Sequence, residues 1–250
     1  MTVKDIFEFL NEKFPISTAE DFDNVGLLIG DENALVNTCV IALDCTKAVI
    51  EQAKNKGAQL IITHHPVIFE PLKAITADSI PALCIKNGIS VISMHTNMDI
   101  GQSGVNDALC ATLKLKDVKA VPAQDGYLVR SGDLPEKMTA EALAIYVSEK
   151  LGAPVRYTCG DGEISTALVC SGSGGSFLED ALRLKAQAFI TGDVKHNVFL
   201  EAADNGLTLI DAGHFYTEDV IVEPLCKMLS ARFPEITFAT HHAYPVKFSY

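Results

Sequence analysis

The sequence lacks the features that mark nucleic-acid-binding and membrane proteins. Its 250 residues include 20 Lys and Arg against 32 Asp and Glu, giving a formal net charge of −12, and the basic residues form no cluster. Such a chain has no positive field for a phosphate backbone. No stretch approaches the roughly 18 apolar residues of a membrane span, and the charged N-terminus is unlike a signal peptide. We therefore expect a cytoplasmic protein that binds neither nucleic acid nor membranes.

Motifs of cysteine and serine chemistry are also missing. The seven cysteines are an odd number and include no C-x-x-C pair. Most lie inside apolar segments, so we expect buried, reduced thiols rather than a disulfide framework or a thiolate metal site. The sequence shows no Ser-His-Asp or Cys-His nucleophile motif. Any chemistry therefore has to be sought among histidines and carboxylates.

Predicted strands alternate with predicted helices along the chain, in a composition with 48% apolar and 21% charged residues. Helical spacing of apolar residues begins at the N-terminus with Val3, Ile6 and Leu10. Further helices are predicted at 47–55, 80–86 and 179–185, from about Val105 and from about His214. Strands are predicted at 40–44, 58–65, 166–171, 186–193 and 207–214, and 89–99 is predicted as a strand followed by a loop. This alternation is typical of parallel βαβ units and predicts an α/β fold with three layers.

The second half of the sequence repeats the first. A-Q-A-F-I-T-G-D (186–193) can be laid over A-Q-L-I-I-T-H-H (58–65), and the D-N-G turn at 204–206 answers N-G at 87–88. We interpret this as an internal duplication that gives two related α/β lobes. The stretch 115–127 has the charge, Pro and Gly of a connection, so the predicted lobes are residues 1–125 and 126–250, with the C-terminal segment able to pack back on the first.

Polar residues gather at the C-terminal ends of the predicted strands. In open α/β sheets this edge is where ligands bind. These residues are Asp44, His64, His65, His95, Asp99, Asp193, His196, His214 and Glu218. Their convergence on one kind of position is a stronger argument for a site than any of the motifs alone.

Two adjacent histidines follow the strand that ends in I-I-T. A regular strand would aim His64 and His65 at opposite faces, but Pro66 restricts His65 and ends the strand. Past a strand end the two rings can splay, and each can take a different metal ion. The alternative is that they are two polar loop residues.

An H-x-x-x-E pattern and an isolated aspartate complete the set. On a helix beginning near His214, that ring and Glu218 share one face; the alternative is a solvated first helical turn. Asp99 is placed in a loop after a strand, as a metal-binding or a structural carboxylate. Imidazole and carboxylate ligands suit Zn, Fe, Mn, Co or Ni, and three histidines with two carboxylates are enough for two ions.

Two further motifs are less specific. The stretch S-G-S-G-G-S (171–176) could bind phosphate through backbone N–H groups, or could be a plain loop, since it lacks the lysine of a P-loop. The pair His241 and His242 has no matched carboxylate in the sequence, which indicates a solvated or interface pair.

Several ordered motifs resemble those of the Nif-three-like proteins, also called the GTP cyclohydrolase I type 2 family or dinuclear metal centre proteins. The motifs are D-F-D-N-V-G-L-L-I-G (21–30), I-T-H-H-P (62–66), H-T-N-M-D (95–99), G-V-N-D-A-L (104–109), I-T-G-D-V-K-H (190–196) and D-A-G-H-F-Y-T-E (211–218). One departure is Asn197, where many relatives have a second histidine.

The resemblance implies two divalent metal ions per subunit, held by His64, His65, Asp99, His214 and Glu218. It also implies that the metal site lies between the two lobes, that the protein forms a homohexameric ring, and that its substrate is a nucleotide-like small molecule.

Three functions follow as alternatives. The first is a metal-dependent hydrolase resembling GTP cyclohydrolase, in which His95 or His196 transfers protons. The second is a non-catalytic metal-binding or regulatory protein of the same family. The third is a structural ring whose metals only stabilise the fold, although structural sites usually avoid open coordination positions.

Overall fold

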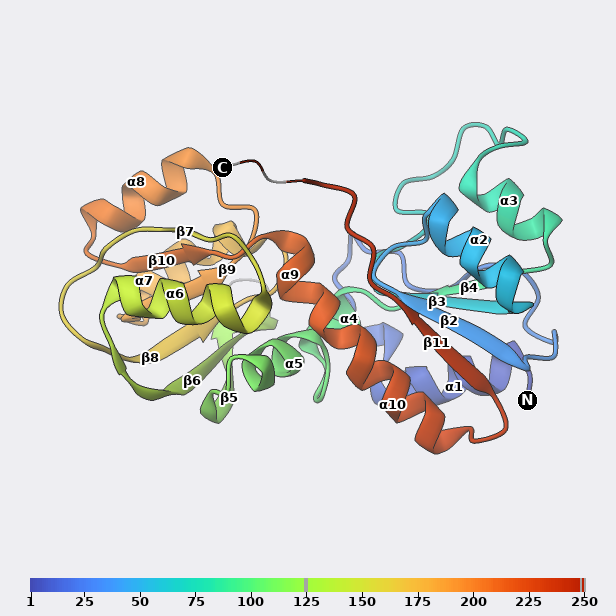
Figure 1. The fold of residues 1–250 in the computed structure, drawn as a ribbon, viewed down its shortest axis with the longest axis horizontal. Coiled ribbons are helices and arrows are strands. Elements are labelled where there is room, and N and C mark those ends of the chain that lie inside the picture. Colours follow the sequence, from blue (N-terminus) through green and yellow to red (C-terminus); the bar gives the residue numbers. More distant parts are fainter. Residues whose placement is uncertain (124–125, 248, 250) are drawn as a thin grey trace. The chain divides into compact units, whose positions relative to one another are not determined.

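Two compact units make up the protein, as seen in a computed structural model that describes all residues except 124–125, 248 and 250. Unit 1 consists of Met1–Gln102 and Val222–Tyr250, and unit 2 of Ser103–Ile221. The lobe boundary predicted after residue 125 falls beside residues outside this description and stays a prediction. The ribbon shows the helices and strands of each unit (Figure 1).

Unit 1 is built on a five-stranded sheet whose inner strands are parallel. The strands, in spatial order, are β1 (Gly26–Ile29), β4 (Ser90–Ser93), β3 (Leu60–Thr63), β2 (Thr38–Ala42) and β11 (Thr237–His241). All pairs are parallel except β1 with β4. The residues of β3 and β4 are buried throughout, as expected when both faces of a parallel sheet are covered.

Helices cover both faces of this sheet, with α2 and α3 on one side and α1 and α10 on the other (Figure 1). Their bounds are α1 Val3–Lys13, α2 Lys47–Lys56, α3 Ile80–Lys86 and α10 Val222–Arg232, with short helices η1 Ile16–Thr18 and α4 Thr96–Ile100. Val40 and Ile61 of the sheet pack with Val49 of α2 and Cys84 of α3 in one buried cluster. The predicted three layers are therefore present.

Local signals in the sequence set the helix ends in unit 1. The Thr2 and Asp5 side chains form a reciprocal capping box at the start of α1, and the Thr46 side chain accepts from the backbone N–H of Val49 at the start of α2. Helix α2 ends at Gly57, which adopts the left-handed conformation with φ 62° and needs no Cβ to be accommodated there.

Unit 2 contains a six-stranded mixed sheet. The strands, in spatial order, are β5 (Lys116–Ala123), β6 (Gly126–Met138), β8 (Ile164–Val169), β9 (Ala188–Thr191), β10 (Thr208–Asp211) and β7 (Arg156–Tyr157). Strands β8, β9 and β10 are parallel, whereas β5, β6 and β7 pair antiparallel with their neighbours.

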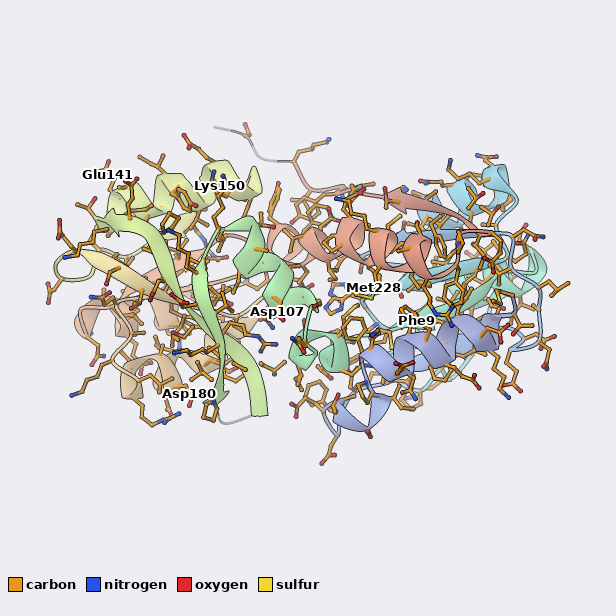
Figure 2. All side chains as sticks on the ribbon, turned by 90° about the horizontal axis from the view of Figure 1, so that it is seen from below. Phe9, Asp107, Glu141, Lys150, Asp180 and Met228 are labelled. Atoms are coloured by element: carbon orange, nitrogen blue, oxygen red, sulfur yellow. The ribbon has the colours of Figure 1, made fainter. Side chains whose placement is uncertain are left out.

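The sheet of unit 2 also lies between two helical layers. The helices are α5 Val105–Thr112, α6 Ala140–Leu151, α7 Leu178–Arg183, α8 His196–Asp204 and α9 His214–Glu218, with η2 Gly174–Phe177 and η3 Asp219–Ile221. Val169 packs with residues of α5 and α6, while its neighbour Leu168 packs with residues of α7 and α8, as strand alternation requires. Glu141 and Lys150, labelled in Figure 2, mark the two ends of α6 with charges that suit its dipole.

The same series of elements occurs in both units, which fits a duplicated two-lobe arrangement. Each series begins with a helix and a strand, continues with a parallel βαβαβ unit and ends in a five-residue helix. The first strand of the series pairs antiparallel with the last strand of the βαβαβ unit. The series is α1 to α4 in unit 1 and α6 to α9 in unit 2. The helix that follows each series belongs to the other unit, since α5 is part of unit 2 and α10 is part of unit 1.

Residues at equivalent positions of the repeat make equivalent hydrogen bonds. The Gln59 side-chain oxygen accepts from the backbone N–H groups of Asn37 and Thr38, and the Gln187 side-chain oxygen accepts from Ser165 and Thr166 in the same way. Each glutamine thus joins the starts of two neighbouring parallel strands.

The sequence prediction of a connection between the lobes is wrong. The stretch 115–127 was expected to be a connection, but it contains the edge strand β5, which pairs with β6. The polar residues of β5 remain exposed because the strand lies at the edge of the sheet, where Pro122 is also tolerated.

We expect Gln59→Ala to lower the free energy of unfolding by about 1 kcal/mol, because two backbone N–H groups lose their acceptor. Urea denaturation monitored by circular dichroism measures the change. Gln102→Ala, at an exposed position outside the sheets, is the matched control and should change stability by less than about 0.5 kcal/mol. Equal effects of the two substitutions would contradict the role given to Gln59.

Candidate metal centre

Three imidazole rings meet in unit 1 where β3 and β4 end. His64 and His65 directly follow β3, and His95 comes two residues after β4. The ring centroid of His64 lies 5.1 Å from that of His65 and 5.1 Å from that of His95. One ligand atom from each of the three rings lies within 4.8 Å of the others, so the group could hold a metal ion. We call His64, His65 and His95 the histidine cluster.

In each ring of the histidine cluster, the Nδ1 atom forms a hydrogen bond with an oxygen atom. The distances from Nδ1 are 2.9 Å to Met94 O for His64, 2.7 Å to Asp44 Oδ1 for His65 and 2.9 Å to Asp23 Oδ1 for His95. Carbonyl and carboxylate oxygens only accept, so Nδ1 carries the proton in each ring. This fixes the tautomer in which Nε2 is the basic atom, the arrangement commonly found behind metal-binding histidines.

Asp23 was not singled out from the sequence, although it lies in the motif D-F-D-N-V-G. Its side chain is fully buried, and its carboxylate also accepts from the backbone N–H and the hydroxyl of Thr96. Burial by itself raises the pKa of Asp23, but the hydrogen bonds from His95 and Thr96 outweigh it and lower the pKa to about 2. Asp23 is therefore ionised at neutral pH and holds His95 in place.

Asp99 is placed beside His64, but on a helix rather than in the predicted loop. The distance from its Oδ1 to Nε2 of His64 is 3.6 Å, and the residue is 7% exposed. It lies in the five-residue helix α4. The side chain of Asn97 accepts from the backbone N–H of His95, and Asp23 holds Thr96 at the start of this helix. Contacts from distant residues thus make a helix where the sequence indicated a loop.

Unit 2 brings together a second set, His214 and Glu218, which we call the α9 pair. The distance from Nε2 of His214 to Oε2 of Glu218 is 2.9 Å, as the predicted helical spacing allows. On the other side of the ring, Nδ1 lies 2.9 Å from Oδ2 of Asp193. Asp193 reaches it from a left-handed backbone conformation with φ 50°. Nδ1 of His214 therefore faces the carboxylate of Asp193, and Nε2 faces that of Glu218, which could bind an ion together with it.

Buried Asp211, at the end of β10, holds the loops around the α9 pair. Its carboxylate accepts from the backbone N–H groups of Val194 at 3.2 Å and Gly213 at 2.9 Å, and it also pairs with Arg156. Val194 follows Asp193 and Gly213 precedes His214. One carboxylate therefore sets the positions of both partners in the His214 hydrogen bond.

The glycine-rich stretch 171–176 packs against the α9 pair. A Cβ on Gly172 would lie 2.1 Å from Oε1 of Glu218, and the residue has φ +63°. Asn106 anchors this loop, since its side-chain oxygen accepts from the backbone N–H of Ser171 at 2.8 Å. The loop therefore allows a close approach of the backbone to Glu218, and its binding of phosphate stays a prediction.

Among the described residues, the other histidines singled out from the sequence are in none of the groups that could hold a metal ion. His196 is exposed at the first position of α8. His241 pairs through Nδ1 with Gln52. The Nε2 atom of His242 lies 3.1 Å from Oε1 of Glu223, so this histidine does have a carboxylate partner, which lies on α10 and was missed.

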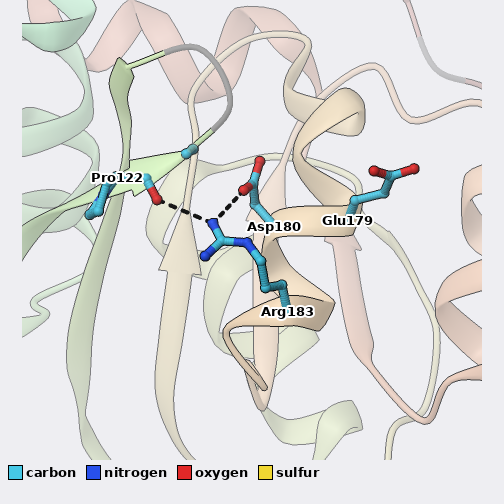
Figure 3. A pocket seen from close by; sticks show the side chains of 5 residues that line it. Pro122, Glu179, Asp180 and Arg183 are labelled. Carbon is cyan, nitrogen blue, oxygen red and sulfur yellow. Dashed lines mark hydrogen bonds and ion pairs between the residues drawn. The ribbon is translucent and has the colours of Figure 1, made fainter.

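A pocket of about 470 Å³ opens in unit 2 beside β5 and α7. It is lined by Pro122, Ala123, Glu179, Asp180 and Arg183. The guanidinium group of Arg183 donates to Oδ1 of Asp180 at 2.6 Å and to the carbonyl of Pro122 at 3.4 Å (Figure 3). The charge of Arg183 is thus already engaged within the protein, and the lining contains none of the predicted site residues.

The fold and these side chains define a class of protein, an α/β chain of two repeated three-layer units whose strand ends carry groups that could hold metal ions. The chain belongs to the family Duf34/NIF3 (NGG1p interacting factor 3), whose model matches residues 1–246. This confirms the resemblance drawn from the motifs.

Relatives match the chain over most of its length. A GTP cyclohydrolase 1 type 2 homolog from Clostridium acetobutylicum is 36% identical over 242 residues, which cover 92% of this chain and 90% of that protein. A hypothetical protein from Staphylococcus aureus has a crystal structure with a TM-score of 0.93 at 30% identity, covering 100% of this chain and 99% of that one. A NIF3-related protein from Bacillus cereus has the same fold, with a TM-score of 0.92 at 22% identity and coverages of 100% and 99%.

No helix in the described part of the chain combines the length and the apolar character needed to cross a membrane.

Replacing Asp23 by Asn should lower the free energy of unfolding by about 2 kcal/mol at pH 7. Because the folded-state pKa is depressed to about 2, the contribution is present above the unfolded-state pKa near 4 and is lost as the pH falls toward 2. Urea unfolding of both proteins at several pH values should show the difference shrinking below about pH 4. The exposed neighbour Asp21, changed to Asn, is the control, and a difference independent of pH would contradict the assignment.

Gly172→Ala should lower the free energy of unfolding by at least about 2 kcal/mol, since it combines a strained φ with a clash against Glu218. Gly175→Ala is the matched control in the same loop, because a Cβ there would have no atom within 4 Å. We expect it to change stability by less than about 0.5 kcal/mol. Thermal and urea unfolding measure both variants, and similar losses would show that the approach of Gly172 to Glu218 is not the cause.

Proposed function

We propose that the protein binds two divalent metal ions through His64, His65 and Asp99 of unit 1 and His214 and Glu218 of unit 2. The observation that carries this proposal is the hydrogen bond at Nδ1 of every histidine in the set. Holding Nδ1 by an oxygen orients the ring and makes Nε2 the ligand atom. In the described structure, Nε2 of His64 and Nε2 of His214 each lie near a carboxylate oxygen of their own unit.

The chemistry of the residues suits such ions. Asp99 and Glu218 are 7% and 4% exposed, and a carboxylate is costly to bury unless a positive group compensates it. Imidazole nitrogens and carboxylate oxygens together suit Zn, Fe, Mn, Co or Ni. His95 lies in the histidine cluster, so its ring could bind metal as well as transfer protons.

The reaction that this site supports best is hydrolysis of a nucleotide-like substrate, as in a GTP cyclohydrolase. Divalent ions bound there would supply an activated water molecule and stabilise developing negative charge. Ionised Asp23 accepts the Nδ1 proton of His95, which leaves Nε2 as the atom that accepts and returns a proton. Exposed His196 could exchange protons with solvent. The curated relatives that match are named GTP cyclohydrolase 1 type 2 homolog, which supports testing GTP first.

We also propose that the protein acts in the cytoplasm as a homohexamer. Free thiols persist in a reducing compartment, and the seven cysteines are all free. Exposed apolar side chains such as Phe22, Leu35 and Ile85, at 65%, 67% and 62% exposure, suit contacts between copies of the chain.

Protein purified without chelator should contain about two divalent ions per chain, measured by elemental analysis. His65→Ala and Glu218→Ala should each lower the metal content by at least about one ion, because each removes one ligand of the proposed set. The control His242→Ala removes an exposed ring bonded to Glu223 and should leave the metal content unchanged. Full metal content in both ligand variants would contradict the proposed set.

The same proteins test the reaction. Metal-loaded wild type and His242→Ala should consume GTP, followed by chromatography of the nucleotides, whereas His65→Ala and Glu218→Ala should lose turnover while remaining folded by circular dichroism. Activity that survives in either ligand variant would refute the hydrolase. Bound metal without product from nucleotides, phosphoesters or amides would instead favour the non-catalytic, regulatory function.

A further inference from the structure

Two cysteine thiols lie in contact in unit 1, and the proposed function does not use them. The Sγ atoms of Cys45 and Cys84 are 3.9 Å apart. Cys45 lies in the loop between β2 and α2 and is partly buried, and Cys84 lies on α3 and is fully buried. Both belong to the apolar cluster between the sheet and these two helices. The pair therefore links two elements that are 39 residues apart in the sequence.

The two thiols are close enough for a weak S–H hydrogen bond, in which either sulfur could be the donor. Such a bond stabilises a thiolate on the accepting sulfur, and thiolates are the nucleophiles of sulfur chemistry. Cys45 is the less buried of the two cysteines.

We propose that Cys45 and Cys84 form a reversible dithiol–disulfide pair that hydrogen peroxide oxidises. The sulfur of one cysteine attacks one peroxide oxygen, which breaks the O–O bond and gives a sulfenic acid and hydroxide. The sulfur of the other cysteine then displaces the hydroxyl group as hydroxide, and the disulfide forms. The two thiols lose two electrons and two protons, and the peroxide is reduced to two water molecules.

The position of Cys45 connects this pair with the histidine cluster. Cys45 directly follows Asp44, whose carboxylate holds Nδ1 of His65 at 2.7 Å. Disulfide formation shortens the distance between the sulfur atoms from 3.9 Å to about 2.05 Å. The loop that carries Asp44 is then tied to α3, and the acceptor behind His65 moves with it. This second step rests on the proposed function, since it predicts weaker metal binding after oxidation.

The disulfide itself is tested on the full chain with metal removed by chelator. Hydrogen peroxide should remove two of the seven free thiols, counted by alkylation and intact mass. Peptide mapping should find Cys45 joined to Cys84, and dithiothreitol should reverse the link. Cys45→Ser and Cys84→Ser should each abolish it, whereas Cys159→Ser, which changes an exposed cysteine, should leave it unchanged.

Three results would overturn the proposal: no loss of thiols, links that involve other cysteines, or oxidation of one sulfur to a sulfinic acid without a link. Circular dichroism establishes that each variant is folded, and Cys45→Ser, at a partly buried position, keeps the test decisive if Cys84→Ser does not fold.

The coupling to metal is measured separately, by competition of reduced and oxidised protein with a chromophoric chelator for Zn²⁺. Oxidation should weaken Zn²⁺ binding about tenfold or more, the range for loss of a hydrogen-bond partner behind a histidine ligand. In Cys45→Ser, peroxide should have no such effect. Equal affinity of the two forms would refute the coupling, while reduced protein that binds no Zn²⁺ would refute the proposed metal site and leave the disulfide result standing.

Discussion

The hydrogen bonds at the Nδ1 atoms of the histidines depend on the order of the parallel strands. Strand β3 lies between β2 and β4, so residues after β3 are flanked by those after its two neighbours. Asp44, after β2, holds His65, and the carbonyl of Met94, after β4, holds His64. In unit 2, Asp193 after β9 holds His214 after β10. For His64, His65 and His214, ring and acceptor thus come from neighbouring strands, so the sheet itself places the oxygen that Nδ1 contacts. His95 is held instead by Asp23, which precedes β1.

Comparison of the two halves of the repeat distinguishes residues that stabilise the fold from residues that could bind metal. Gln59 and Gln187 accept hydrogen bonds from the starts of neighbouring strands in the same way. Asn87 and Asn205 follow equivalent helices, and each side-chain amide donates a hydrogen bond to the backbone carbonyl four residues earlier. At the ends of β3 and β9 the repeat diverges, because His64 and His65 correspond to Gly192 and Asp193 in the sequence repeat. The framework was kept in both halves while the residues at the strand ends changed.

The sequence predicts the strand ends well because they depend on local patterns. Apolar runs followed by Pro66 or by a glycine turn give β3, β4 and β10 to within a few residues, and with them the polar residues beyond. Asp23 could not be assigned a role in this way, because it reaches His95 across 72 residues from a segment without regular structure. The assignment of α5 to unit 2 could not be predicted either, since helix periodicity predicts a buried face without saying which sheet covers it.

The loop after β2 connects the thiol pair with the histidine cluster, because adjacent residues cannot move independently. Asp44 and Cys45 share a peptide bond. The next residue, Thr46, is the N-cap of α2, and its side chain accepts a hydrogen bond from the backbone N–H of Val49. With that end fixed to the helix, a displacement of the Cys45 sulfur toward α3 has to be taken up on the Asp44 side of the loop. A carboxylate that orients a ring tolerates little movement, because hydrogen bonds weaken steeply as they bend and lengthen. Covalent change at Cys45 therefore acts on the ring of His65 through the shortest available path.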